Sequence, residues 1–333
     1  MMLLLKKYFL ILVSGLLVSP ILAQDIHLSQ YYTSNISLNP AYTGNYSGDI
    51  RVTCNYRTQW GQVNKPIRTN MFSFEKKKEN FGDEIAWGFI VINDQLSTYN
   101  LSTSKFFLSG SYQKKIQANY FRAGIQAGLA HRSTDLNGQT FPDQWHYGTG
   151  TFDQEIYHGE TELNDSYTYP DFNAGLGWFR FLGKTRVAAG YGLFHVSRPR
   201  ANFLGDFRLP LRHVFNASAI HPLSESLHAL PYLLYMNSAT ATDFVLGSNL
   251  KKNLSKTINI QAGAGYRGSR INSDAVILLA GFGYGRLDFA ISYDITVSEL
   301  SNNARNKSAV EFSLIYTTPR RFSDKISIPC NRY

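Results

Sequence analysis

Large apolar residues alternate with polar ones in many segments of the chain, and the segment 286–297 shows this pattern most clearly. One face of that segment carries Leu287, Phe289, Ile291, Tyr293 and Ile295. The opposite face carries Arg286, Asp288, Ala290, Ser292 and Asp294. A period of two predicts a β-strand and not a helix. A half-exposed sheet of a soluble protein would show the same pattern, so the number of such segments decides what the apolar face meets.

Comparable segments recur along the chain and predict about 14 strands. The expected ranges are 50–57, 67–75, 85–91, 101–115, 121–129, 172–181, 187–196, 212–221, 227–236, 242–250, 257–266, 275–284, 286–297 and 309–317. An even number of strands is what a closed bacterial barrel in one chain requires when both ends of the barrel lie on the same side. No linker divides the series, so we expect a single barrel over residues 48–318.

The connections between the predicted strands differ in length according to the end of the barrel on which they fall. Tight links are expected at 117–119, 182–184 and 284–285, whereas the opposite end receives the long connections 132–168 and 198–211. Short periplasmic turns and longer external loops are typical of outer-membrane barrels. Backbone groups left unpaired in hydrocarbon are costly, so strands that cross a bilayer must close on themselves. The pattern therefore predicts an all-β protein, a transmembrane antiparallel outer-membrane β-barrel.

Both ends of the chain are expected to lie outside the barrel wall. Residues 1–23 combine two lysines, an apolar run over 8–18 and a terminal Ala23, which is typical of a secretory signal peptide cleaved after that alanine. An uncleaved anchor is the alternative, but the apolar run is short for spanning a bilayer. Residues 24–47 lack clean periodicity and predict an irregular arm, either in the periplasm or plugging the barrel. Residues 319–333 are expected to form a C-terminal periplasmic tail.

Composition agrees with a barrel and gives few clues to chemistry. The chain holds 21 Tyr, 22 Phe and 26 Gly, and only 17% of its residues are charged. The formal net charge of +9 is spread along the chain and forms no stripe for nucleic acid. Two cysteines, Cys54 and Cys330, are too few for a disulfide framework, and pairing between them or two free thiols are both open.

Three groups of residues resemble chemical sites, and none has the spacing that its chemistry needs. They are the glycine run 263–268, the loop residues His146, His158 and Glu160, and the pairs His195–Ser197 and His213–Ser218. The glycines lie within and at the end of a predicted strand, not before a helix as dinucleotide binding requires. The loop residues match no metal motif. Neither pair comes with an aligned nucleophile, base and acid, so we expect no catalytic, cofactor-binding or metal site.

The longest predicted external loop is rich in aromatic residues. These are Trp145, Tyr147, Phe152 and Tyr157. Exposed aromatic side chains are typical of binding surfaces. They are candidates for contact with a partner protein, and packing of the loop into the mouth of the barrel is the alternative.

Basic residues gather in two predicted periplasmic turns. These are Lys76, Lys77 and Lys78, within the run 75–79, and Lys251 and Lys252. A solvated turn is the ordinary interpretation of such a run. Docking of an anionic periplasmic partner is the functional interpretation, because surface charge steers association.

Several short motifs, in order along the chain, resemble the PorP/SprF family of outer-membrane proteins in the type IX secretion and gliding machinery of Bacteroidetes. At the start of the mature chain the similar residues are Asp25, Ser29, Gln30, Tyr31, Asn39, Pro40, Ala41 and Gly44. Further similar stretches are 57–60, 170–175, 212–213, 266–267, 274–275, 292–294 and 311–314. The chain departs from the family at Val310, where a histidine is common, and after Cys330, where the family's usual ending is absent, so a family role for the tail does not carry over.

The resemblance implies a barrel of about this strand number without enzymatic activity. It also implies binding of secreted adhesins that carry a type B C-terminal sorting domain, which are exported and held at the surface. Periplasmic and other type IX secretion components are the further partners it implies, with Asp25, Gln30, Asn39 and Pro40 as the expected contacts in the arm. A channel for small or hydrophobic solutes is the alternative function, and it predicts an open lumen.

Overall fold

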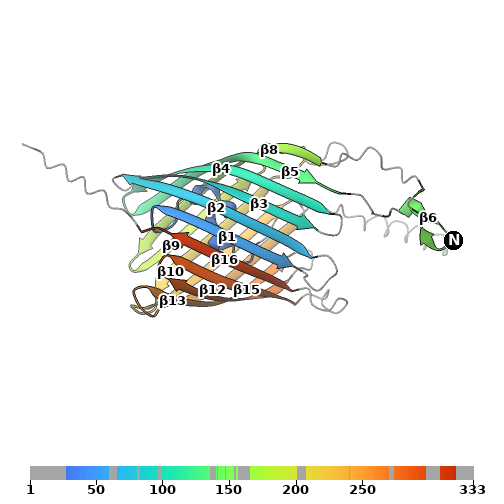
Figure 1. Cartoon of the computed structure of the whole chain (residues 1–333). Coiled ribbons are helices and arrows are strands. Elements are labelled where there is room, and N and C mark those ends of the chain that lie inside the picture. Colours follow the sequence, from blue (N-terminus) through green and yellow to red (C-terminus); the bar gives the residue numbers. More distant parts are fainter. Residues whose placement is uncertain are drawn as a thin grey trace, which may run out of the picture.

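The computed structural model forms a closed barrel with an arm folded into its lumen (Figure 1). It describes residues 28–59, 66–80, 83–96, 100–135, 140, 142–146, 148–153, 155–156, 166–200, 208–239, 241–269, 274–297 and 308–319. Within these residues, 14 strands make up the barrel. The predicted outer-membrane β-barrel of about 14 strands is therefore confirmed.

The barrel wall consists of long strands joined in sequence order. They are β1 (Ile50–Gln59), β2 (Ile67–Asn80), β3 (Asp83–Leu96), β4 (Leu101–Ile116), β5 (Asn119–Ser133), β8 (Ser166–Leu182), β9 (Thr185–Phe194), β10 (Arg212–Pro222), β11 (Leu227–Ser238), β12 (Ala241–Asn253), β13 (Ile258–Ser269), β14 (Ala275–Tyr284), β15 (Leu287–Thr296) and β16 (Ala309–Thr317). Each strand pairs antiparallel with its neighbours, and β1 pairs with β16 to close the sheet. Closure leaves no edge whose backbone would face lipid.

Side chains alternate between lipid and lumen along every strand, as β5 illustrates. Ile125 points outward and is 72% exposed, whereas Arg122 and Gln126 of the same strand point inward and are buried. The outward row is apolar because it meets hydrocarbon, and the inward row is polar because it meets the arm and the lumen. The buried core thus lies inside the barrel, where apolar residues of the arm such as Tyr31, Leu38 and Tyr42 pack against the wall.

The two ends of the barrel differ as predicted. At one end, links of two to four residues join β2 to β3, β4 to β5, β8 to β9, β10 to β11, β12 to β13 and β14 to β15. The other end holds the longer connections, including 134–165 and 195–211. The short-turn end is the periplasmic end of an outer-membrane barrel, and the long-loop end faces the outside. No helix within the described residues is long and apolar enough to cross a membrane.

Short elements complete the described chain. The arm contains η1 (Tyr31–Thr33), α2 (Asn35–Leu38) and η2 (Pro40–Tyr42). The longest connection contains η4 (Pro142–Gln144) and a small hairpin of β6 (Trp145–His146) and β7 (Thr151–Phe152). Figure 1 shows this hairpin well away from the barrel wall.

Candidate functional site

The arm fills the lumen with short turns instead of crossing it as a strand. Five residues of the arm are at most 1% exposed to solvent: Ser29, Gln30, Ile36, Asn39 and Thr43. Proline at the first position of η2 already has the backbone angle that a helical turn needs, and the Asn39 side chain accepts a hydrogen bond of 2.9 Å from the amide of Ala41. The arm then continues into β1 at the periplasmic end.

A charged seat of four barrel side chains holds the beginning of the described arm. It consists of Arg57 on β1, Arg267 on β13, Asp294 on β15 and Glu311 on β16. Arg57 lies 3.0 Å from Asp294 and 3.2 Å from Glu311, and Arg267 lies 3.1 Å from Asp294. Two positive and two negative groups balance one another, which is the condition under which charges tolerate burial.

The arm supplies the remaining partners of the charged seat. The backbone amides of Ser29 and Gln30 donate to the two carboxylate oxygens of Glu311 at 2.8 and 3.1 Å. The Ser29 hydroxyl donates to Asp294 at 2.6 Å, and the Gln30 side chain donates to the Ser292 hydroxyl at 3.0 Å. Five of the stretches that resemble the family therefore meet at one buried point, although the sequence places them far apart.

A glycine seat on the opposite wall receives η2. It consists of Gly124 on β5, Gly175 and Gly177 on β8, and Gly190 on β9. A side chain at any of these positions would overlap the arm: at Gly177, for example, a Cβ atom would lie 2.9 Å from the Tyr42 ring. Glycine at these inward positions therefore lets the backbone and the Tyr42 ring of the arm approach the sheet closely. The Asn39 side chain donates to the carbonyl of Leu176 at 2.9 Å, and the Tyr42 hydroxyl accepts from the Asn216 side chain at 2.8 Å.

A third contact fixes the end of the arm before β1. The amide of Gly44 donates to Glu75 at 2.8 Å, and the Thr43 hydroxyl lies 2.7 Å from that of Ser109. Gly44 has a φ of +80°, a conformation that favours glycine, and it turns the chain here. Arg122 donates to the carbonyl of Thr43 at 3.1 Å, so the wall satisfies the arm's backbone at this point as well.

The arm separates two cavities inside the barrel. The outer cavity lies in the half of the barrel nearer the long loops and has a volume of about 70 Å³. Tyr31 and Leu38 of the arm line it. The inner cavity, in the periplasmic half, measures about 360 Å³ and is lined by Tyr32, Arg186 and other residues. The outer cavity has room for a few water molecules. Burial, with the neighbouring phenol of Tyr232, raises the pKa of Tyr31 above its ordinary value.

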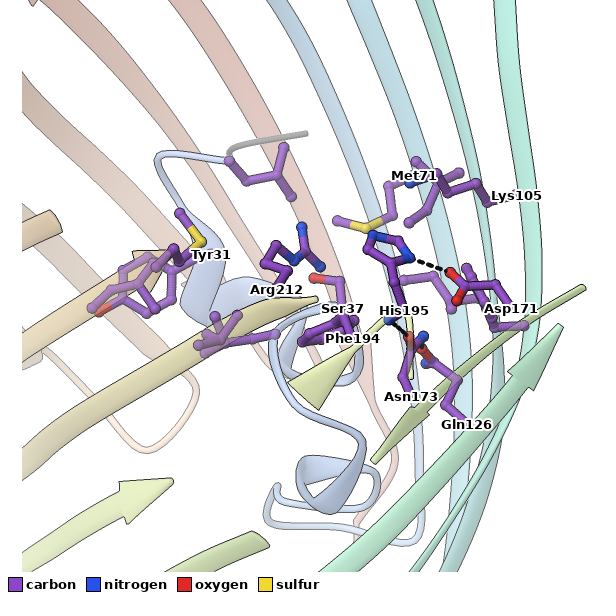
Figure 2. A pocket seen from close by; sticks show the side chains of 18 residues that line it. Tyr31, Ser37, Met71, Lys105, Gln126, Asp171, Asn173, Phe194, His195 and Arg212 are labelled. Carbon is purple, nitrogen blue, oxygen red and sulfur yellow. Dashed lines mark hydrogen bonds and ion pairs between the residues drawn. The ribbon is translucent and has the colours of Figure 1, made fainter. Parts of the chain in front are cut away.

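Polar groups lie on one side of the outer cavity, as Figure 2 shows. His195 is held through Nδ1, 2.7 Å from Asp171, and its amide donates to the Asn173 side chain at 3.0 Å. Arg212 stacks over the Phe194 ring at 4.2 Å. The other walls are mainly apolar, so the cavity is amphipathic.

The predicted contact residues of the arm and loop lie in very different surroundings. Gln30, Asn39 and Pro40 are buried against the barrel wall, which differs from the expected contact with periplasmic components, because the lumen satisfies their polar groups. Trp145 and Phe152 pair across the β6–β7 hairpin with ring centroids 4.9 Å apart, and both remain exposed. Asp25, Tyr147 and Tyr157 lie outside the described residues, as do Cys330, His158 and Glu160.

The lysines predicted to lie in periplasmic turns extend two strands instead. Lys76, Lys77 and Lys78 lie in β2, not in a turn, because the strand continues its ladder with β3 as far as Asn80. Lys77 points inward and lies 2.8 Å from Glu84, while Lys76 and Lys78 point outward. Lys251 and Lys252 also extend a strand, β12; Lys251 lines the inner cavity and lies 3.5 Å from Asp288.

The remaining candidates for chemistry are accounted for within the described chain. The glycine run 263–268 lies in β13, followed by another strand, which is incompatible with the dinucleotide motif. His213 lies 2.8 Å from the Tyr191 hydroxyl, and His146 accepts from the amide of Thr149 at 3.2 Å. The described residues contain no group of three or more side chains placed to hold a metal ion.

A family model described as type IX secretion system membrane protein PorP/SprF matches residues 21–316. No curated protein matches the sequence. Among solved structures, the Pseudomonas putida toluene transporter TodX is similar at 10% identity and a TM-score of 0.53, over 87% of this chain and 95% of that one. The Ralstonia pickettii toluene transporter TbuX is similar at 10% identity and a TM-score of 0.50, covering 86% and 94%. A Pseudomonas aeruginosa FadL homologue gives 12% identity and a TM-score of 0.50, covering 84% and 92%; at such identities the likeness concerns the fold alone.

Proposed function

The chain belongs to the PorP/SprF family of type IX secretion system membrane proteins, and we propose that it is a non-enzymatic, plugged barrel that binds a secreted adhesin and holds it at the cell surface. The cargo is an adhesin with a type B C-terminal sorting domain. The barrel contributes a fixed position in the outer membrane, and its external loops contribute the contact. Other components of the secretion system are its further partners.

The filled lumen is the observation that carries this proposal. Three separate contacts hold the arm, and the outer cavity above it has a volume of only about 70 Å³. Within the described residues, an arm held in this way obstructs the passage of a polypeptide or a large solute. A barrel with an obstructed centre is better suited to holding a partner than to conducting one.

The external hairpin supplies the proposed contact. Trp145 and Phe152 present two aromatic rings on a short hairpin, and the Gln144 side chain donates at 3.0 Å to the carbonyl of Ile156 at its base. Aromatic side chains carry a large share of binding energy in protein interfaces. The proposed contact set is Trp145, Tyr147, Phe152 and Tyr157.

The test is a pull-down of the tagged full-length barrel from detergent-solubilised outer membrane, with the co-purifying proteins identified by mass spectrometry. A large surface protein with a C-terminal sorting domain is the expected partner. Deleting residues 140–160, or the double change Trp145→Ala and Phe152→Ala, should release that protein into the medium. Thr149→Ala in the same hairpin keeps both rings and should retain it. Retention that survives the deletion would overturn the loop assignment.

A channel for small or hydrophobic solutes is the second candidate. It is favoured by the apolar walls of the outer cavity, which include Met71, Phe107 and Leu234, and by the fold shared with toluene transporters. The two functions predict different behaviour in a planar bilayer. A barrel that purifies without a partner and conducts ions with its arm in place would favour the channel.

A further inference from the structure

The outer surface of the barrel has a groove at its periplasmic end that runs along β3 between β2 and β4. Trp87 and Ile85 form its floor and are 51% and 62% exposed. The strand register places Lys76 beside Trp87 and Lys78 beside Ile85 on one side. On the other side it places Gly110 beside Trp87 and Tyr112 beside Ile85, and Lys114 follows two positions along. The groove has a volume of about 940 Å³.

The depth of the groove in the membrane follows from its residues. Side chains that point outward from this barrel meet lipid, and a charged group is tolerated there only near the interface. Outward lysines on β2 and β4 therefore mark the level of the periplasmic headgroups. Trp87 and Tyr112 belong to the aromatic girdle that barrels place at this level. Phe74 and Phe89, stacked at 5.8 Å, continue the outer wall into the hydrocarbon.

The charges of the groove are unbalanced. Its one acidic side chain among the described residues, Asp83, lies 3.4 Å from Lys114 and accepts a hydrogen bond of 2.7 Å from the Tyr112 hydroxyl. No ion pair joins Lys76 or Lys78 to another described residue. Lys77, the lysine between them, points inward and is neutralised by Glu84. The groove therefore has an excess of positive charge above an apolar floor.

We propose that this groove binds an anionic phospholipid of the periplasmic leaflet. The phosphate lies between Lys78 on β2 and Lys114 on β4, two strands that neighbouring-strand spacing separates by about 10 Å across β3. Lys76, two positions further along β2, adds positive charge beside Trp87. The glycerol and the start of an acyl chain lie over Ile85 and Trp87. Gly110 leaves room beside the indole, since a Cβ atom there would meet only the Ala86 carbonyl, at 4.0 Å.

The direction in which the lysines point favours a lipid over an acidic protein as the ligand. A periplasmic protein approaches the ends of the strands, whereas Lys76 and Lys78 project from the lipid-facing side of β2. An apolar floor between two cationic walls matches a molecule with a charged head and a hydrocarbon tail. Each basic residue near such a headgroup contributes modestly, and several together give selectivity for anionic over zwitterionic lipid.

Native mass spectrometry of the full-length barrel, titrated with phosphatidylglycerol or with phosphatidylcholine of the same chains, tests the proposal. One phosphatidylglycerol should bind more tightly than phosphatidylcholine. The change K76Q/K78Q/K114Q should weaken it by roughly tenfold or more. The control K184Q/K252Q/K256Q removes three exposed charges at the same end but outside the groove, and should bind as the unchanged barrel does.

A second variant distinguishes a specific binding site from a general effect of positive charge. Gly110→Phe fills the groove without altering charge, on the lipid-facing side where a larger apolar residue is tolerated, and it should also weaken phosphatidylglycerol binding. Equal binding of both lipids, or equal loss in the control triple variant, would overturn the proposal. Displacement of the lipid by inorganic phosphate alone would also overturn it. The same holds if K76Q/K78Q/K114Q loses a periplasmic protein in a pull-down while its lipid binding is unchanged.

Discussion

Ser29 and Glu311 are 282 positions apart in the chain, and the backbone amide of Ser29 donates a hydrogen bond of 2.8 Å to Glu311. Glu311 lies on β16, the strand that closes the barrel against β1. The charged seat also draws on Arg57 of β1, so it is complete only once those two strands have paired. Insertion of the arm into its final position therefore depends on closure of the sheet.

Removing one charge from this seat should loosen the arm and destabilise the barrel. Glu311→Gln leaves two buried arginines with a single carboxylate, and breaking a buried pair costs about 3–5 kcal/mol. We expect the free energy of unfolding in urea, followed by tryptophan fluorescence in micelles, to fall by about that amount. Glu225→Gln makes the same chemical change in an exposed turn and should leave stability unaltered. A Glu311→Gln barrel as stable as the control would mean that the charges do not hold the arm.

A side chain in the glycine seat should push η2 away from the wall. Gly175→Leu would overlap Asn39, which lies against this glycine and caps η2. We expect the arm to become sensitive to added protease while the barrel remains resistant. Ala127→Leu adds similar bulk on the lipid-facing side of β5 and is the control. Equal cleavage of both variants would show that the arm is accessible without any displacement.

Deleting the arm should convert the closed barrel into a conducting one. A chain without residues 28–44 retains all 14 strands and loses the turns that divide the two cavities. In planar bilayers the deletion should produce steady ion currents, whereas the intact protein should stay silent. Currents of equal size in both would support the channel function instead.

Fixing the arm in place should leave adhesin retention unchanged if the barrel works only as an anchor. Thr43 and Ser109 have hydroxyls 2.7 Å apart, so cysteines at these two positions are close enough to form a disulfide. Cys54 is exposed on the outer wall, and both it and Cys330 are changed to serine to prevent side reactions. Retention lost on oxidation and restored by a reductant would mean that the arm moves during function.

The sequence carries enough information to predict the wall of the barrel but not its contents. A period of two identified the lipid-facing and lumen-facing rows, and unequal connections identified the periplasmic end, because both are local properties of the chain. The charged seat was beyond such reasoning. Only closure of the sheet brings the Arg57 guanidinium within 3.2 Å of the carboxylates of Asp294 and Glu311, which lie on other strands.

The errors have physical causes as well. The lysines at 76–78 suggested a turn, yet they extend β2, because outward lysines near the membrane surface are as compatible with a strand as with a loop. Inward glycines such as Gly175 gave no sign of a partner, since a missing side chain carries no pattern. The exposed aromatic pair Trp145 and Phe152 was singled out from composition alone, and its role in adhesin binding stays a prediction.

Because the plug and the wall are one polypeptide, every copy of the barrel carries its own barrier to diffusion at a fixed ratio of one to one. Under the proposed function, a cell can therefore raise the number of these barrels in its outer membrane without a proportional rise in permeability. A plug supplied by a second gene would need matched expression to achieve the same protection. Under the proposed anchoring function, the abundance of the barrel is thereby separated from the permeability of the membrane.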